Sequence, residues 1–287
     1  MSRPTVLLTG SAGQLGFELA RSLAAHGDVV AYDRAALDLA DGGALVTTVR
    51  SVRPQLIVNA AAYTAVDRAE SEPEHAHAIN AVAPGILAEE ARRSRALLVH
   101  FSTDYVFDGT ADAPYTEDAP TAPLNVYGQS KLAGERAIAA TGASSLILRT
   151  SWVYGWRGSN FLLTIRRLAA ERDELRIVAD QVGVPNWTRA LAEATAALIG
   201  RGLPALFERV GLYHLSATGS TTWFDFARAI IGDATRPRVV PIATADYPTP
   251  ARRPAYSVLG TDKLERTFGI KLGHWREMLT ACLASGR

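Results

Sequence analysis

The chain starts with a short apolar strand pattern that is followed at once by closely spaced glycines and then by a helical pattern. Residues 5–9 (TVLLT) are β-branched or apolar, which is typical of a strand buried on both faces of a parallel sheet. Gly10, Gly13 and Gly16 follow, and a helical pattern occupies residues 17–23. Strand, glycine turn and helix in this order predict a nucleotide-binding α/β unit, in which the glycines let a pyrophosphate approach the backbone. The spacing G-x-x-G-x-x-G is not the commoner G-x-G-x-x-G, so the motif has weight only in this context.

Further apolar runs alternate with helical stretches up to residue 150. The expected strands are 28–32, 56–59, 97–101 and 146–150, and residues 74–93 show a helical pattern. Such alternation predicts an α/β fold with a Rossmann-like, doubly wound parallel sheet. Beyond residue 150 the segments become shorter. We therefore expect an NAD(P)-binding Rossmann domain over residues 1–150 and mainly a smaller substrate-binding lobe over residues 151–287.

The end of the second expected strand carries two conflicting signals about the cofactor. Asp33 lies roughly where a dinucleotide fold places the acid that binds the ribose. An acid there favours NADH, because it accepts from the 2′-hydroxyl and repels a 2′-phosphate. The adjacent Arg34 favours NADPH, because it could pair with that phosphate. Both cofactors stay open, and a loop aspartate that caps the next segment is the alternative interpretation of Asp33.

Tyr127 and Lys131 are four residues apart in a predicted helix, so they lie about one turn apart on the same face. A neighbouring ammonium lowers the pKa of a tyrosine and makes proton exchange with a carbonyl or alcohol oxygen feasible. Thr103 follows the expected strand 97–101, and a hydroxyl there could donate to the same substrate oxygen. Tyr-x-x-x-Lys alone is common on protein surfaces, so the assignment depends on the rest of the chain.

Composition excludes several classes of protein. The net charge is +1, which gives no sign of a nucleic-acid partner. Cys282 is the only cysteine, so no intramolecular disulfide is possible and a reducing compartment fits. No signal-peptide layout and no apolar stretch of membrane-spanning length is present, so we expect a cytoplasmic protein without a membrane partner. His75 and His77 do not share a helix face, and we take them as surface residues rather than metal ligands.

Six motifs that occur in order along the chain are similar to those of one known family. They are TGSAGQLG (9–16), VNAAAYTAVD (58–67), STDYVF (102–107), PLNVYG (123–128), RTSWVY (149–154) and DQVGVP (180–185). Together they closely resemble the dTDP-4-dehydrorhamnose reductase family of extended short-chain dehydrogenase/reductases, nearly end to end. The resemblance implies an oxidoreductase that uses NADPH or NADH to reduce the 4-keto group of dTDP-4-dehydro-L-rhamnose. The product, dTDP-L-rhamnose, is a nucleotide sugar for carbohydrate and cell wall polysaccharide biosynthesis.

The resemblance also implies roles for individual residues. Thr103, Tyr127 and Lys131 match the catalytic triad, in which the tyrosine donates a proton, the lysine lowers its pKa and binds the nicotinamide ribose, and the threonine orients the carbonyl. Thr103, Asp104 and Trp152 match substrate-contacting positions. Arg253 is a further candidate, since arginines on its proline-rich loop suit a phosphate ester. The expected cofactor-binding residues are Gly10, Gly13, Gln14, Leu15, Gly16, Asp33, Arg34, Asp38, Leu39, Ala62, Tyr63, Thr64, Phe101, Tyr127 and Lys131.

The chain departs from the family's pattern at a magnesium site. Some members form a dimer through magnesium held by glutamates. Glu18 matches one such position, but Arg189 stands at another, and a third has no clear counterpart. A guanidinium removes a hard oxygen ligand and adds a like charge. We therefore expect no bound metal and either a monomer or a homodimer without a magnesium bridge.

Two other functions remain as alternatives. A redox-neutral, NAD-dependent nucleotide-sugar epimerase or dehydratase would return the hydride to its substrate. A non-catalytic regulatory subunit of the same fold would bind a partner enzyme, although the intact Thr103, Tyr127 and Lys131 favour an enzyme.

Overall fold

A parallel sheet of six strands lies at the centre of the computed structural model, which describes residues 3–286. Its strands in spatial order are β10 (Gly211–His214), β5 (Ser145–Thr150), β4 (Leu97–Thr103), β3 (Leu56–Asn59), β1 (Thr5–Thr9) and β2 (Asp28–Tyr32). Every neighbouring pair is parallel. All residues of β3, β4 and β5 are buried, which explains why these strands are so apolar in sequence. The predicted doubly wound sheet is confirmed. Its strand order reverses between β1 and β3, where open α/β sheets bind their ligands.

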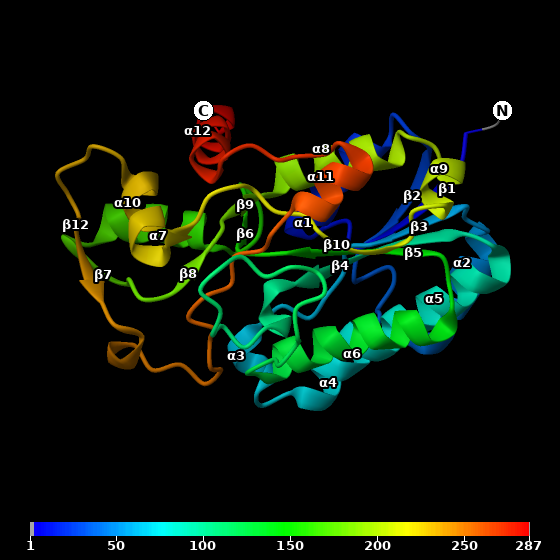
Figure 1. Cartoon of the computed structure of the whole chain (residues 1–287), viewed down its shortest axis with the longest axis horizontal. Helices are drawn as coiled ribbons and strands as arrows, with labels where there is room; N and C mark the ends of the chain where they lie inside the picture. The colour runs from blue at the N-terminus through cyan, green and yellow to red at the C-terminus, as the bar shows by residue number, and fades with distance from the viewer. Residues whose placement is uncertain (1–2, 287) are drawn as a thin grey trace.

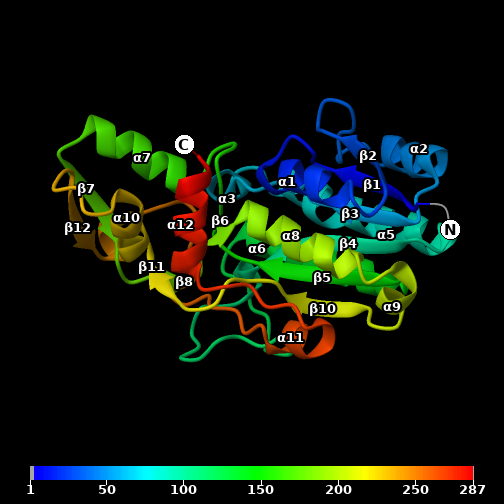
Figure 2. The same cartoon turned by 90° about the horizontal axis from the view of Figure 1, so that it is seen from above.

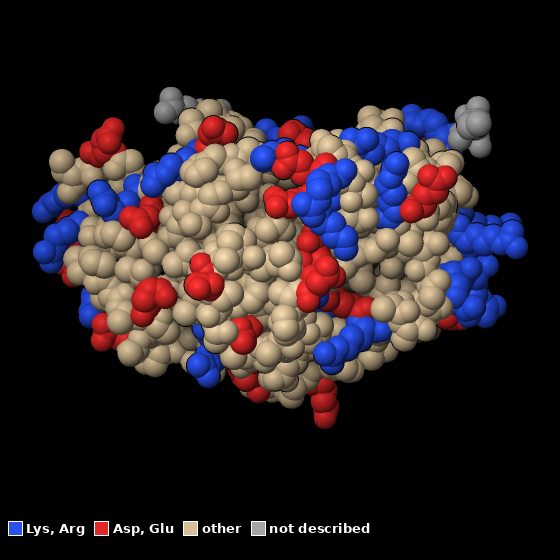
Figure 3. All heavy atoms as spheres, in the orientation of Figure 1, with Lys and Arg blue, Asp and Glu red and all other residues tan. Residues whose placement is uncertain are grey.

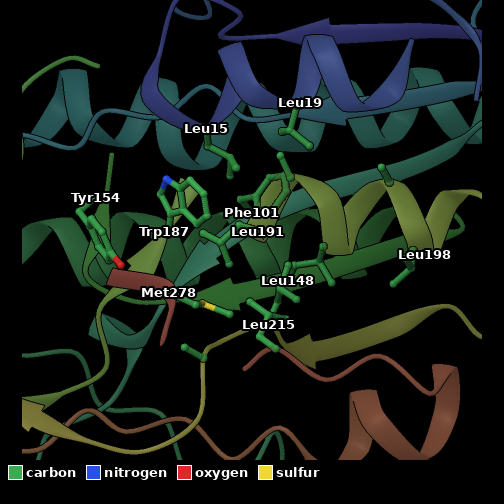
Figure 4. Packing of buried hydrophobic residues seen from close by; sticks show 14 of the residues in the cluster. Leu15, Leu19, Phe101, Leu148, Tyr154, Trp187, Leu191, Leu198, Leu215 and Met278 are labelled. Atoms are coloured by element: carbon green, nitrogen blue, oxygen red, sulfur yellow. The ribbon is translucent and has the colours of Figure 1, made fainter. Parts of the chain in front are cut away.

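Helices cover both faces of the sheet (Figure 1). One face carries α1 (Gln14–Leu23), α8 (Thr188–Ile199) and α9 (Leu203–Phe207), and the other carries α2 (Gly42–Val52), α5 (Ala83–Ser94) and α6 (Val126–Thr141). Successive side chains of a strand point to opposite faces of the sheet, so each strand packs against both helical layers. In β1, Val6 and Leu8 belong to one apolar cluster and Leu7 to the other. Figure 4 shows part of the first cluster, which includes Leu15 of α1 and Leu191 of α8.

The helical stretch expected over residues 74–93 is one run of three segments. It consists of α4 (Pro73–His77), the π-helical segment η1 (Ala78–Val82) and α5, and it follows the short helix α3 (Val66–Ala69). The wide turn of η1 places the buried side chain of Asn80 against both the β3–α3 connection and α6. Single π-helical turns are frequent at functional sites.

Beyond β5 the chain builds a smaller lobe and also returns to the sheet. The lobe lies at the left of Figures 1 and 2 and contains three short strand pairs, β6–β9, β8–β11 and β7–β12. β10 and α8 come from this second half and complete the sheet and one helical layer, so the boundary expected at residue 150 does not cut the molecule cleanly. The other elements are β6 (Val153–Tyr154), α7 (Phe161–Glu171), β7 (Glu174–Val178), β8 (Val182–Gly183), β9 (Asn186–Trp187), β11 (Thr221–Thr222), α10 (Trp223–Ile231), β12 (Arg238–Ile242), α11 (Asp262–Phe268), α12 (Trp275–Ser285) and the 3₁₀ turns η2 (Asp104–Val106) and η3 (Thr244–Asp246).

The surface carries charges of both signs. Figure 3 shows Lys and Arg interspersed with Asp and Glu on the face that it draws, together with large areas of other residues. Over residues 3–286, none of the helices combines the length and the apolar character needed to cross a membrane.

Candidate functional site

The glycine turn lies at the carboxyl end of β1, beside the crevice where the strand order reverses. Gly10 has a φ of +75°, and a Cβ there would lie 2.8 Å from the backbone of Ala61, which follows β3. A Cβ at Gly16 would lie 2.1 Å from the carbonyl oxygen of Gly10, so α1 packs directly on the turn. Gly13 is the N-cap of α1, and the described structure gives this helix neither a side-chain cap nor an acid in its first turn. The backbone N–H groups at the start of α1 are therefore available to bind an anionic group.

The next two residues of the motif have structural partners. The Gln14 side chain donates to the carbonyl oxygen of Ser159 (3.3 Å) and accepts from Asn160 Nδ2 (2.8 Å), so it ties the glycine turn to the loop before α7. The Leu15 side chain lies in the core above the sheet. Both remain predicted cofactor residues, and Leu15 would contribute its backbone.

The residues after β2 form a capped turn. Asp33 Oδ1 accepts from the backbone N–H of Ala36 at 2.9 Å, so the capping interpretation holds for one carboxylate oxygen and leaves Oδ2 for a ligand. Arg34 is exposed on the same turn, and Leu39 is buried. Asp38 caps a second turn by accepting from the Ala40 N–H at 3.0 Å.

The segment after β3 is fixed by Asn80. The Tyr63 N–H donates to Asn80 Oδ1 (2.9 Å), and Asn80 Nδ2 donates to the Tyr63 carbonyl (3.0 Å) and to Ser130 Oγ on α6 (3.0 Å). The Tyr63 hydroxyl donates to Glu72 at 2.7 Å. Ala62 is partly buried and Thr64 is exposed beside this clamp. The clamp holds the small residues at the end of β3 in a set position relative to α6.

The structure brings the three predicted catalytic residues to the carboxyl end of β4. Thr103 is the last residue of β4, and its hydroxyl donates to Asp104 Oδ1 at 3.1 Å. Tyr127 lies in the first turn of α6, with its ring edge-on to Tyr105 at 5.5 Å between centroids. Lys131 lies one turn further and is 2% exposed; its Nζ donates to the carbonyl oxygen of Phe101 at 2.6 Å.

The pKa of Tyr127 does not follow the expected direction. Burial of the phenol raises its pKa to about 12, the Thr103 hydroxyl lowers it and Asp104 raises it further. Lys131 is not among the groups that shift this pKa in the structure described, and its Nζ makes its close contact with a carbonyl oxygen of β4. Burial lowers the pKa of Lys131 to about 8, against an opposing effect of Glu135.

An ion pair that sequence reasoning missed lies one further turn along α6. Arg149 of β5 donates two hydrogen bonds to Glu135, at 2.8 and 2.6 Å, and Ser102 Oγ donates to the same carboxylate at 2.5 Å. Both charged side chains are almost completely buried, and breaking such a pair typically costs about 3–5 kcal/mol. Glu135 lies four residues after Lys131, so helical spacing was the signal that could have found it.

Trp152 and Arg253, the other two predicted substrate residues besides Thr103 and Asp104, lie on the side of the smaller lobe. Trp152 has a φ of +41°, and its ring stacks on that of Trp223 with centroids 3.4 Å apart. Arg253 makes a bidentate pair with Asp67 of α3, at 3.0 and 2.8 Å, so its charge is already partnered. Arg253 also lines a pocket of about 420 Å³ together with Asp180, Gln181, Thr244, Tyr247, Pro248, Thr249, Pro250, Ala251, Arg252 and Ala255.

An ion pair also lies where the sequence departs from the family's magnesium site. Arg189 Nε lies 3.5 Å from Glu18 Oε2, which joins the start of α8 to α1 within one chain. Among residues 3–286, no group of three or more His, Cys, Asp or Glu side chains is placed to hold a metal ion.

Comparisons with known proteins find relatives that match nearly the whole chain. The family model described as "RmlD substrate binding domain" matches residues 4–287. A dTDP-4-dehydrorhamnose reductase of Burkholderia thailandensis is 47% identical over 97% of this chain and 97% of its own length. One of Escherichia coli K12 is 46% identical over 94% of both chains. The crystal structure of a dTDP-4-dehydrorhamnose reductase from Bacillus anthracis in complex with NADP has a TM-score of 0.92 and 36% identity, and covers 99% of this chain and 100% of its own.

Proposed function

The chain belongs to the dTDP-4-dehydrorhamnose reductase family, and we propose that it reduces the 4-keto group of dTDP-4-dehydro-L-rhamnose to give dTDP-L-rhamnose. One observation supports the proposal most directly. The side chains of Thr103, Tyr127 and Lys131 lie near one another at the carboxyl edge of β4. Two strands away in the sheet, β1 ends in the glycine turn. A proton donor beside a dinucleotide crevice is what a carbonyl reductase needs.

The residues at the crevice fit a nicotinamide dinucleotide. Gly10 has no room for a side chain where the end of β1 approaches the backbone of Ala61, and α1 follows its N-cap Gly13 without a competing acid in its first turn. The first-turn N–H groups of α1 would hold the pyrophosphate, and the free oxygen of Asp33 or the guanidinium of Arg34 would meet the adenine ribose. When bound, the reduced nicotinamide supplies the hydride.

Tyr127 holds the proton that the reduction consumes. Its pKa of about 12 keeps the phenol protonated at neutral pH, which is the state that a proton donor requires. Thr103 would donate its hydroxyl hydrogen to the carbonyl oxygen in place of Asp104, and so orient it toward Tyr127. Lys131 has one N–H beyond its bond to Phe101 and its contact with His100, and this N–H is available to the cofactor ribose or the phenol.

The nucleotide end of the substrate is proposed to reach toward the pocket beside Arg253. Arg252 is exposed there, and Tyr247 presents an exposed ring. A guanidinium and an aromatic ring suit a diphosphate and a base. Trp152 and Asp104 would contact the sugar between this pocket and Tyr127.

The first test replaces Tyr127 by phenylalanine. General acid catalysis typically contributes about 10²–10⁴-fold, so Tyr127→Phe should lose most turnover and still bind the reduced cofactor. Tyr105→Phe makes the same chemical change, the loss of a phenol hydroxyl, in the ring that packs against Tyr127, and it is the matched control. Turnover of Tyr127→Phe close to that of the control would sink the assignment.

The same assay separates the alternative functions. A reductase consumes reduced cofactor in proportion to substrate, whereas an epimerase or dehydratase returns the hydride and shows no net consumption. A regulatory subunit would convert neither the nucleotide sugar nor the reduced cofactor. The assay is run with dTDP-4-dehydro-L-rhamnose and with NADH and NADPH in turn, because the preferred cofactor is not decided by Asp33 and Arg34.

We propose the cytoplasm as the site of this reaction, because Cys282 is a buried free thiol and fits a reducing compartment. A monomer and a homodimer both remain compatible with the proposed chemistry, since every residue assigned to it comes from one chain.

A further inference from the structure

A buried chain of polar side chains crosses three strands of the sheet and ends at Lys131. Thr9 of β1 donates to Asn59 Oδ1 of β3 at 2.7 Å. Asn59 Nδ2 lies 3.0 Å from Nδ1 of His100 on β4. His100 Nε2 lies 3.2 Å from Lys131 Nζ on α6. Thr9, Asn59 and His100 are fully buried, so these contacts are made without competition from solvent.

The surroundings of His100 favour the neutral form of its imidazole. Burial, together with the nearby Lys131 charge, holds the pKa of His100 well below its ordinary value. A neutral imidazole has one N–H donor and one acceptor nitrogen. If Nδ1 accepts from Asn59, Nε2 carries the proton and donates to Lys131. If Nδ1 carries the proton and donates to Asn59, Nε2 accepts from Lys131.

Two arrangements match a donor to an acceptor at every contact in this chain of side chains. With the amide as it stands, Asn59 Nδ2 donates to Nδ1, the ring proton lies on Nε2, and Nε2–H donates to Lys131 as a neutral amine. With the amide turned over, Nδ1–H donates to Asn59 Oδ1, and Nε2 accepts from Lys131 as an ammonium. The Thr9 hydroxyl can donate or accept, so it partners either end of the amide. In both arrangements Nζ keeps its hydrogen bond to the Phe101 carbonyl.

We propose that His100, held by Asn59 and Thr9, is a positioning residue that fixes Lys131 Nζ in one place in both charge states, and whose tautomer changes with the charge of the lysine. The inference deepens the proposed function, because Lys131 is part of its catalytic set. As an acceptor, His100 stabilises the ammonium and so delays the loss of the lysine's charge as the pH rises.

Other titratable or charged groups near Lys131 come from three elements. On α6 itself these are Tyr127 and Glu135, of which the carboxylate favours the ammonium. Arg149 of β5 is held by Glu135, and Asp104 of η2 acts on Tyr127. None of these is a hydrogen-bond partner of Lys131 Nζ in the described chain, whereas His100 is in direct contact with it. Replacing His100 therefore acts on the lysine in a way that these groups do not reproduce.

The decisive experiment is nuclear magnetic resonance of the substrate-free protein. The chain has three lysines, Lys131, Lys263 and Lys271, so a ¹³C-lysine spectrum follows the loss of charge at Lys131 directly. The ¹⁵N shifts of the histidine rings report which nitrogen carries the proton, and His100→Gln identifies the His100 signals.

We expect His100 to change from the Nδ1–H to the Nε2–H tautomer at the pH where Lys131 loses its charge, without passing through an imidazolium. In Lys131→Met the tautomer should not change with pH. A single His100 tautomer throughout the titration of Lys131 would overturn the proposal.

Kinetics give a second, independent measurement. His100→Leu removes the acceptor, so the pKa of Lys131 should fall and the alkaline limb of the kcat profile should move to lower pH by about one to two units, the scale of a hydrogen bond to a charged group. His100→Gln keeps an acceptor and a donor and should restore the limb to near its wild-type pH. Equal profiles for the two variants would show a packing role and contradict the inference. If the wild type turns over no nucleotide sugar while the tautomer change is present, then the proposed function fails and the positioning role stands.

Discussion

Asp104 is a carboxyl group that the fold keeps almost without solvent, with 1% of its surface exposed. Burial raises its pKa from 3.8 to about 6, against hydrogen bonds that lower it, including one from Thr103. A carboxyl whose pKa is higher in the folded protein costs stability once the pH exceeds the unfolded value, and the cost is complete above the folded pKa. The residue therefore makes the folded state less stable at pH 7 than at pH 4.

Replacing Asp104 by asparagine should remove this pH dependence. The free energy of unfolding of Asp104→Asn relative to the wild type should rise by up to about 3 kcal/mol between pH 4 and pH 7, measured by urea denaturation. Asp108→Asn is the matched control with the opposite sign, because the backbone N–H of Thr110 and the Tyr115 hydroxyl lower the pKa of Asp108. A difference for Asp104→Asn that stays flat across this pH range would contradict the assignment.

Arg34 decides the choice of cofactor if it meets a 2′-phosphate. Arg34→Ala should then weaken NADPH binding by about 1–3 kcal/mol, the scale of a charge-assisted hydrogen bond, and leave NADH nearly unchanged. Equilibrium titration of each reduced cofactor measures the effect. Equal losses for the two cofactors would show that the arginine acts on the turn and not on the phosphate.

The sequence predicted part of the candidate site, but not the residues that hold the predicted side chains in position. Thr103, Tyr127 and Lys131 were predictable because their chemistry and helical spacing are visible in sequence, and the structure brings them together. His100 and Asn59 were not, because each follows a run of apolar residues in its strand and shows no motif, and only the register of β3 and β4 sets them side by side. The partner of Arg253 was equally hidden, since Asp67 lies 186 residues away.

At the scale of elements, the loop beside the pocket is fastened to the two helices that border the site. Asp67 of α3 binds the Arg253 guanidinium and accepts from the Ala251 N–H at 3.2 Å. Asn125, the N-cap of α6, donates to the Arg252 carbonyl at 2.8 Å. The helix that carries Tyr127 and the loop that lines the pocket are thus joined directly.

Loosening this loop should affect substrate binding more than chemistry. Asp67→Asn weakens a partly exposed ion pair, so KM for the nucleotide sugar should rise by about fivefold, equivalent to about 1 kcal/mol, with a smaller change in kcat. The exposed Asp112→Asn is the matched control for the loss of one negative charge. A KM that changes no more than in the control would show that the clamp does not position the pocket.

Periodicity predicted most elements because buried parallel strands leave continuous apolar runs. The helical pattern over residues 74–93 corresponds to the run of α4, η1 and α5, which begins and ends within one residue of those bounds. The sheet position of β10 was not predictable in this way. Its four residues, Gly211–His214, include a glycine and a histidine, and their pairing with β5 depends on contacts far along the chain.

At the scale of the whole molecule, the pair formed by Glu18 and Arg189 bears on assembly. It joins α1 and α8 where a magnesium site would need carboxylates, and magnesium bound by one carboxylate is weak. Chelation with EDTA should therefore change neither the molecular mass in solution nor the activity. Light scattering with and without EDTA measures this. A dimer that dissociates on chelation and re-forms with magnesium would show that Arg189 was misinterpreted.

The return of the chain to the sheet has a consequence for how the protein is made. β5 ends at Thr150, but its outer neighbour β10 begins only at Gly211. While a ribosome adds the intervening stretch at roughly 5–20 residues per second, β5 has one unpaired edge for about 3–12 s. Unpaired strand edges are templates for joining to other chains. Until β10 pairs with β5, the nascent protein therefore presents this additional open strand edge to other chains.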